Sequence, residues 1–217
     1  MKNGYGPSGA KPLIVFTKHS PCLVAGLKDF TNSRGEKLEV RPVMSLCRCG
    51  QSKERPYCDG SHSAAGFAGE KEDCRAPDSL RDYRGRDIIV HFNLGVCSHS
   101  GICVKGLPNV FDVNKKPWIN ADGAGARDII AIIERCPSGA LSYTTGTERR
   151  GEIEREPAIR VDRNGPLEIS GGIILLDDME SKPELAEHYT LCRCGRTKNS
   201  PFCDGNHISC RFWDDKN

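Results

Sequence analysis

The same arrangement of cysteine and histidine residues occurs twice in this 217-residue chain. Residues 46–62 are LCRCGQSKERPYCDGSH and residues 191–207 are LCRCGRTKNSPFCDGNH, so 11 of 17 positions are identical at an offset of 145 residues. In each copy a Cys-x-Cys pair is followed, after eight intervening residues, by a third cysteine and, after three more, by a histidine. Thiolates and imidazoles are common metal ligands, and so short a segment cannot bury a core of its own. The repeat therefore predicts two metal sites.

The potential ligands are the three cysteines and the histidine of each copy. They are Cys47, Cys49, Cys58 and His62 in the first copy, and Cys192, Cys194, Cys203 and His207 in the second. Gly50 allows a turn that brings the two sulfurs of the Cys-x-Cys pair together. Cys58 and His62 are four residues apart and share one face of a short helix that Asp59 is expected to cap. Four such ligands fit either a tetrahedral Zn²⁺ or a [2Fe–2S] cluster.

The pattern C-x-C-G-x-S/T-x3-P-x-C-D-G-x-H resembles the signature of the CDGSH iron–sulfur domains, or NEET family, at every anchor in both copies. The resemblance implies two [2Fe–2S] clusters, each with three cysteine ligands and one histidine. It places Cys47 and Cys49 on one iron and Cys58 and His62 on the other, with Cys192/Cys194 and Cys203/His207 as the second set. Asn206 stands where the first copy has Ser61, and we expect a shifted potential there rather than a lost cluster.

A third group of cysteines lies between the two copies. A predicted strand at 87–92 precedes Cys97 and Cys103, β-type runs follow at 110–113 and 118–119, and an amphipathic helix at 126–135 leads to Cys136-Pro137 and a strand at 141–144. This order resembles a single-cluster bacterial ferredoxin, and more closely the divergent mono-cluster ferredoxin family. The resemblance implies that Cys97, Cys103 and Cys136 bind a third cluster.

The ferredoxin pattern is Cys-x2-Cys-x2-Cys with a distant Cys-Pro. In this chain its second position is occupied by Ser100 instead of cysteine. Three cysteines suit a [3Fe–4S] cluster directly, whereas a [4Fe–4S] cluster requires Ser100, His99 or a solvent ligand on its fourth iron. The alternative is a ferredoxin-shaped domain that has lost its cluster and serves as a spacer.

The elements that position these ligands indicate an α+β protein with three small domains. We expect a CDGSH domain at 1–77, a ferredoxin-like α+β domain at 78–148 and a second CDGSH domain at 149–217. Strands are predicted at 12–17 and 37–41, and again at 158–161 and 165–169, whereas 64–84 is typical of a loop and 145–157 of a linker. Because CDGSH domains pair as two-fold dimers, the resemblance implies that the two β-rich halves form an intrachain pseudo-dimer.

Composition excludes several classes of protein. Formal net charge is +2, from 31 basic and 29 acidic side chains, without the basic stripe that tracks nucleic acid. Apolar runs such as that at 173–176 are far shorter than the roughly 20 residues of a membrane helix. No apolar segment of signal-peptide type begins the chain, so we expect a cytoplasmic protein whose 12 cysteines are reduced. Cys22, Cys74 and Cys210 stand outside the motifs and are expected to be merely structural or tolerated thiols.

The predicted function is soluble electron transfer by a monomer, with an unidentified redox protein as partner. Storage of clusters, or their transfer to an apo-protein acceptor, is the first alternative, and a zinc-binding structural adaptor is the second. We expect no enzyme, because the sequence has neither a glycine-rich nucleotide loop nor a poised nucleophile–base pair.

Overall fold

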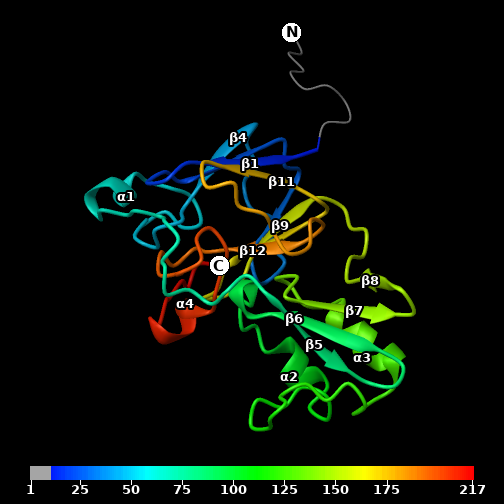
Figure 1. Ribbon diagram of the computed structural model, residues 1–217. Helices are drawn as coiled ribbons and strands as arrows, with labels where there is room; N and C mark the ends of the chain where they lie inside the picture. Colours follow the sequence, from blue (N-terminus) through cyan, green and yellow to red (C-terminus); the bar gives the residue numbers. More distant parts are fainter. Residues whose placement is uncertain (1–10) are drawn as a thin grey trace.

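The computed structural model describes residues 11–217, which form an α+β fold with three four-stranded sheets. Two of the sheets lie next to each other in the upper part of the molecule in Figure 1, and the third forms a separate lobe below them. The predicted fold class is confirmed. None of the helices in residues 11–217 has the length and apolar character that crossing a membrane requires.

The first sheet is built mainly by the N-terminal half. In spatial order it contains β11 (Ile174–Asp177), β1 (Leu13–Phe16), β2 (Cys22–Ala25) and β4 (Val43–Leu46). Ile14 and Phe16 are buried while their neighbours along β1 are more exposed, which is the alternation of a strand with one face on the core. The outer strand β11 comes from the C-terminal half and pairs with β1 in parallel, with Leu13 opposite Ile174.

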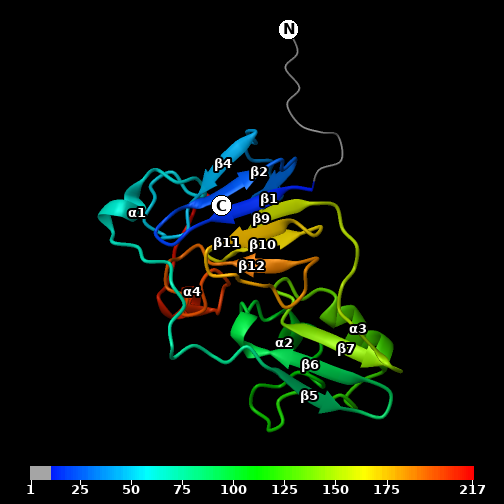
Figure 2. The ribbon, with the colours of Figure 1, turned by 45° about the horizontal axis from the view of Figure 1, so that its top comes forward.

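The second sheet repeats this arrangement with the halves exchanged. In spatial order it contains β12 (Tyr189–Leu191), β10 (Leu167–Ser170), β9 (Ala158–Val161) and β3 (Asp29–Thr31). Here β3 is the outer strand that the N-terminal half contributes, and it pairs with β9 in parallel, with Phe30 opposite Ile159. Each half therefore lends one strand to the other, and the two CDGSH-like halves form one interlocked body, as the pseudo-dimer prediction requires (Figure 2).

The central lobe consists of an antiparallel sheet and three short helical segments. The sheet contains β5 (Leu80–Arg84), β6 (Ile89–Asn93), β7 (Leu141–Thr145) and β8 (Glu148–Arg150). The helical segments are the 3₁₀ turn η1 (Leu94–Val96), α2 (Ile102–Gly106) and α3 (Ala126–Ile133). Helix α3 buries Ile129, Ile132 and Ile133, as its amphipathic pattern predicts. Trp118 packs edge-on against Phe92, with ring centroids 4.8 Å apart.

Each CDGSH-like motif ends in a single helical turn. These turns are α1 (Ser61–Ala64) and α4 (Asn206–Ser209), and each starts after a glycine in the left-handed conformation, Gly60 or Gly205. In both ribbon views α4 lies between α1 and the central lobe (Figures 1 and 2). The two motifs are alike in sequence but differ in their distance from the third sheet.

Several local predictions are wrong. Residues 37–41 form no strand apart from an isolated bridge between Lys37 and Thr31, and the strand follows Pro42 as β4 instead. The run at 110–113 meets 118–119 only through the bridge between Phe111 and Ile119. The expected loop at 64–84 and the expected linker at 145–157 contain β5 and β8, respectively. These two strands are rich in charged residues and lie largely exposed, so they lack the apolar alternation by which strands are recognised.

Candidate metal centres

The first site brings its four predicted ligands together in two pairs. The sulfurs of Cys47 and Cys49 are 3.7 Å apart, and Cys58 Sγ is 3.3 Å from His62 Nδ1. The Cys-x-Cys pair is buried, whereas Cys58 and His62 are partly exposed. Because His62 turns Nδ1 toward the cysteine sulfur, Nδ1 is the nitrogen placed to bind a metal.

The second site repeats this geometry closely. The sulfurs of Cys192 and Cys194 are 3.6 Å apart, and Cys203 Sγ is 3.4 Å from His207 Nδ1. Cys203 is buried here, unlike its counterpart Cys58. The two copies thus present the same donor atoms at the same spacing in unequal surroundings.

The donors of each site come in two pairs, and this pairing bears on which metal group fits. Metal–sulfur bonds of about 2.3 Å in a tetrahedron separate two ligand sulfurs by about 3.8 Å, which matches both Cys-x-Cys pairs. Among residues 11–217, no three Cys, His, Asp or Glu side chains gather closely enough to hold one ion. A mononuclear zinc site would need all four donors around one point, whereas a [2Fe–2S] cluster needs two donors on each of two irons. The donor set therefore fits the cluster better than zinc.

Hydrogen bonds within each motif hold the ligand loop in place. Ser52 Oγ donates to the carbonyl of Tyr57 at 2.7 Å, and Thr197 Oγ1 donates to the carbonyl of Phe202 at 2.7 Å, so the S/T position serves the same purpose in both copies. Asp59 does not provide the helix N-cap, which is Gly60. Its carboxylate instead accepts from the amides of Ser61 and Lys53. Hydrogen bonding by the Ser61 side chain, together with these amides, holds the pKa of Asp59 well below its usual range.

The two Cys-x-Cys turns pack against each other across the pseudo-two-fold axis. Gly50 and Gly195 both have positive φ, as the turn requires. A methyl group at Gly50 would lie 2.6 Å from the carbonyl oxygen of Cys194, and one at Gly195 would overlap the carbonyl of Cys49. Each of these positions therefore requires glycine for two reasons: the positive φ of the turn and the close approach of the two sites.

A buried arginine occupies the middle of each Cys-x-Cys pair, and sequence reasoning missed both. Arg193 forms a buried ion pair with Asp214. Arg48 has no carboxylate partner among the described residues and donates instead to the carbonyls of Thr17 and Ser20 at 3.1 Å. The sequence does carry a sign of these arginines, because the segment LCRCG is identical in both copies of the motif.

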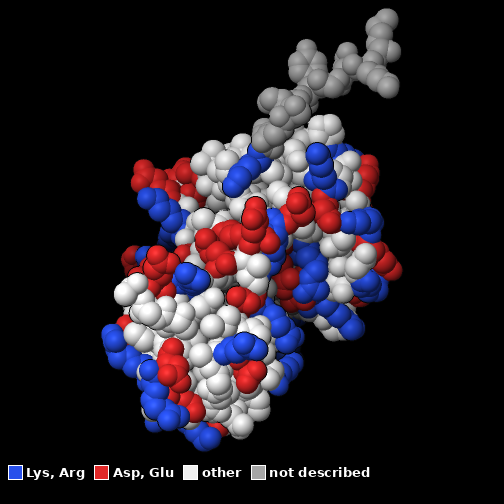
Figure 3. Space-filling view, turned by 90° about the vertical axis from the view of Figure 1, so that its right-hand side faces the viewer, with Lys and Arg blue, Asp and Glu red and all other residues white. Residues whose placement is uncertain are grey.

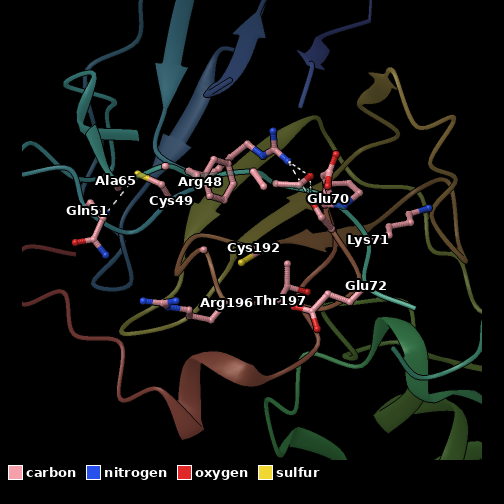
Figure 4. A pocket seen from close by; sticks show the side chains of 17 residues that line it. Arg48, Cys49, Gln51, Ala65, Glu70, Lys71, Glu72, Cys192, Arg196 and Thr197 are labelled. Carbon is pink, nitrogen blue, oxygen red and sulfur yellow. Dashed lines mark hydrogen bonds between the residues drawn. The ribbon is translucent and has the colours of Figure 1, made fainter. Parts of the chain in front are cut away.

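Arg48 also belongs to the environment of the second site. It lines a pocket of about 360 Å³ together with Cys49 and Cys192 (Figure 4). The Arg48 guanidinium stacks on the Phe16 ring at 3.9 Å, and burial lowers its pKa. A guanidinium stays charged even so, and Cys192 of the second site is close enough to interact with this positive charge.

Burial disfavours free thiolates at most of the predicted ligands. It raises the pKa of Cys49 to about 11 and the pKa of Cys203 well above its ordinary value. The pKa of Cys192 is lowered instead, to about 6, mainly by a hydrogen bond from Cys194. Binding a metal here requires loss of the thiol protons, so loading of these sites releases protons.

The three central cysteines converge on one cavity of about 750 Å³. Cys97 follows η1, Cys103 lies in α2 and Cys136 follows α3, so three separate elements deliver them. Burial raises the pKa of Cys97 to about 12, with smaller contributions from Cys136 and Cys103. Ser100 and His99 line the same cavity. The structure thus brings together the residues that the ferredoxin resemblance selects.

The remaining cysteines lie outside these groups. Cys22 is buried in β2, and burial raises its pKa to about 12, so it is an inert core thiol. Cys74 and Cys210 are exposed.

Comparison with known proteins identifies the three segments. Residues 19–63 and 164–208 match the family described as iron-binding zinc finger, CDGSH type, and residues 83–146 match the family described as divergent 4Fe-4S mono-cluster. All eleven predicted ligands lie within these segments. The uncharacterized protein YjdI of Escherichia coli (strain K12) is 44% identical over 63 residues, 29% of this chain and 83% of that protein, and YjdI of Escherichia coli O157:H7 matches equally. No solved structure matches.

Proposed function

Because this chain belongs to the iron–sulfur proteins in which two CDGSH-type iron-binding domains flank a divergent 4Fe-4S mono-cluster domain, we propose that it transfers electrons between other proteins. The observation that carries this proposal is the duplicated pairing of donors, with separations of 3.3 to 3.7 Å within each pair. Clusters bound in this way supply one-electron chemistry, and the protein supplies their positions and electrostatic surroundings.

The proposed ligands are those of the sequence prediction. Each CDGSH site would use three cysteines and one histidine for a [2Fe–2S] cluster, and Cys97, Cys103 and Cys136 would hold a third cluster, of [3Fe–4S] or [4Fe–4S] type. Histidine ligation raises the potential of an iron–sulfur cluster relative to all-cysteine ligation. The two CDGSH sites are therefore proposed to lie at higher potential than the central site, so that electrons move from the centre outward.

The proposed carrier is a monomer whose partner is a redox protein. On the face shown in Figure 3, Lys/Arg and Asp/Glu of the described residues are intermingled, which gives no support to a nucleic-acid partner. The chain is proposed not to be an enzyme. A row of hydrogen bonds from Asp82 through His91 to Thr144 joins three neighbouring strands at 2.7 and 2.8 Å, and we assign it the structural role of tying the central sheet together.

Anaerobic potentiometric titration with electron paramagnetic resonance (EPR) tests the proposal. We expect a coloured protein whose signals appear in at least two steps, the histidine-ligated clusters at the higher potential. A colourless protein that contains zinc would overturn the proposal. So would clusters that are destroyed, rather than reversibly reduced, when one electron is added to each.

Cluster transfer is a second candidate, favoured by the exposure of the first site. Cys58 and His62 are partly exposed and Asp59 and Gly60 are exposed, so an acceptor protein can approach this end of the site. The test is whether cluster appears intact on an apo-ferredoxin faster than it decays in the absence of the acceptor. Zinc-dependent scaffolding has less support, because no three donors of the described residues converge on one ion.

A further inference from the structure

The two CDGSH motifs differ in what covers the glycine of their Cys-Asp-Gly segment. Gly60 and Gly205 have nearly the same backbone conformation, with φ of 87° and 84°. Gly60 is exposed, and a methyl group placed there would meet nothing within 4 Å. Gly205 is buried, and a methyl group there would overlap the ring of His99. The central lobe therefore touches the second motif at a point where the first motif faces solvent.

The contact joins the ligand loops of two different sites. His99 lies two residues after Cys97, and Gly205 lies two residues after Cys203. His99 has a φ of 55°, a left-handed conformation that is uncommon for any residue with a side chain and is retained where the surroundings hold it. The loop geometry thus presents the imidazole to the second CDGSH motif.

Further hydrogen bonds fix the central lobe on the C-terminal half. Asn199 Nδ2 donates to the carbonyl of Gly95 at 2.8 Å in a buried contact just ahead of Cys97. Asn93 Nδ2 donates to Glu184 at 2.7 Å, and Arg155 donates to the carbonyl of Glu134 at 2.7 Å. These three hydrogen bonds join the central lobe to the C-terminal half, so they hold the lobe that carries His99 against the half that carries Gly205.

From this asymmetry we infer that the three sites form a linear relay, in which His99 against Gly205 connects the central site to the second CDGSH site only. The second site in turn meets the first through the packed turns at Gly50 and Gly195. Once a partner redox protein has reduced the central site, one electron would leave that site, which is oxidised, and enter the second CDGSH site, which is reduced. The same electron would then pass to the first CDGSH site, whose exposed end is accessible to an external acceptor. The inference rests on the proposed function.

The unmodified holoprotein provides the first test, by microwave power saturation of its EPR signals after full reduction. A paramagnetic centre speeds the spin relaxation of a close neighbour. We therefore expect the two [2Fe–2S] signals to separate into two equal components, one relaxing fast beside the central site and one relaxing slowly. A single saturation component for both CDGSH clusters would overturn the relay. Absence of iron would instead refute the proposed function itself.

Two matched glycine variants locate the contact. Gly205→Ala and Gly60→Ala introduce the same backbone strain, but only Gly205→Ala forces the His99 loop away. We expect loss of the fast component in Gly205→Ala and its retention in Gly60→Ala. Removal of the imidazole in the double variant Gly205→Ala/His99→Ala relieves the overlap, and the fast component should return.

Retention of the fast component in Gly205→Ala at full iron content would show that the contact does not set the distance between the sites. If Gly205→Ala loses its second cluster, the wild-type saturation experiment still decides between the relay and three independent sites.

Discussion

Arg48 shows how one residue can make two similar sites unequal. It is buried without a carboxylate partner among the described residues, beside Cys192, whereas Arg193 is neutralised by Asp214. Reduction adds negative charge to a cluster, so a nearby uncompensated cation favours the reduced form. We expect this charge to raise the potential of the second CDGSH cluster.

Arg48→Gln should therefore lower the potential of the second CDGSH cluster. A unit charge roughly 8–16 Å away at an effective dielectric constant of about 20 contributes roughly 1–2 kcal/mol. For one electron this corresponds to about 40–90 mV. Potentiometric EPR titration measures the shift, with Arg41→Gln, an exposed arginine paired with Glu39, as the control. A potential equal to that of the wild type would show that Arg48 only packs.

Replacement of a histidine ligand should affect its own cluster alone. In His62→Cys or His207→Cys the site becomes all-cysteine, so its potential should fall and its cluster should survive longer in acid. Voltammetry and the decay of the visible absorption near pH 5 measure the two effects. If neither effect occurs in either variant, histidine is not a ligand.

His188 gives the fold a dependence on pH that is separate from the clusters. It is buried, and desolvation, helped by Arg155, lowers its pKa below 6.5 despite the neighbouring Glu187. The unfolded chain therefore binds this proton more readily than the folded chain does. The stability that His188 contributes is complete above about pH 6.5 and is lost as the pH falls, with a slope of at most about 1.4 kcal/mol per pH unit.

His188→Gln should remove this part of the acid destabilisation. Thermal unfolding of wild type and variant at about pH 7.5 and about pH 5.5 measures it, and cluster loss cancels because both proteins carry the same clusters. We expect the stability of the variant relative to wild type to be greater at the lower pH. An unchanged difference between the two proteins would contradict the role of His188.

At the level of elements, strand exchange is the feature that the sequence could not predict. The repeat identified two equivalent halves, and the family resemblance implied that they pair. The exchanged strands are β11, which pairs in parallel with β1, and β3, which pairs in parallel with β9. Both pairings join segments that are far apart in the chain. Local alternation of apolar residues carries no information about such partners. The contact between His99 and Gly205 was hidden for the same reason, whereas the paired ligands were predictable because their spacing is local.

Strand exchange makes each half incomplete by itself. A fragment of residues 1–77 retains β1, β2 and β4 but lacks β11, and its β3 has no sheet to join. We expect this fragment to dimerise or to remain unfolded, because so small a sheet buries too little apolar surface. Size-exclusion chromatography with light scattering measures the outcome. A monomeric, folded fragment that binds its cluster would contradict the interlocked architecture.

The turns between the two sites offer a finer test of the same packing. Gly50→Ala places a methyl group against backbone of the other half, whereas Gly35→Ala has a similar φ of 79° and open space around it. We expect Gly50→Ala to lower the melting temperature more than Gly35→Ala does. Equal effects would mean that only backbone conformation, and not the approach of the two sites, requires glycine.

The whole molecule places three candidate centres in one compact chain. The interlocked halves hold two of them, and the central lobe, fixed to the C-terminal half, holds the third. The domain boundaries at 77/78 and 148/149 stay predictions, and the exchanged strands show that sequence halves and sheets do not coincide.

The most direct test of the account is the count of iron and acid-labile sulfide per chain, with EPR, on anaerobically purified protein. Two [2Fe–2S] clusters and one [3Fe–4S] or [4Fe–4S] cluster predict about seven or eight irons per chain and a reducible signal from each of the three sites. About four irons would leave the central site without a cluster and remove the start of the relay. Zinc in place of iron would contradict the account.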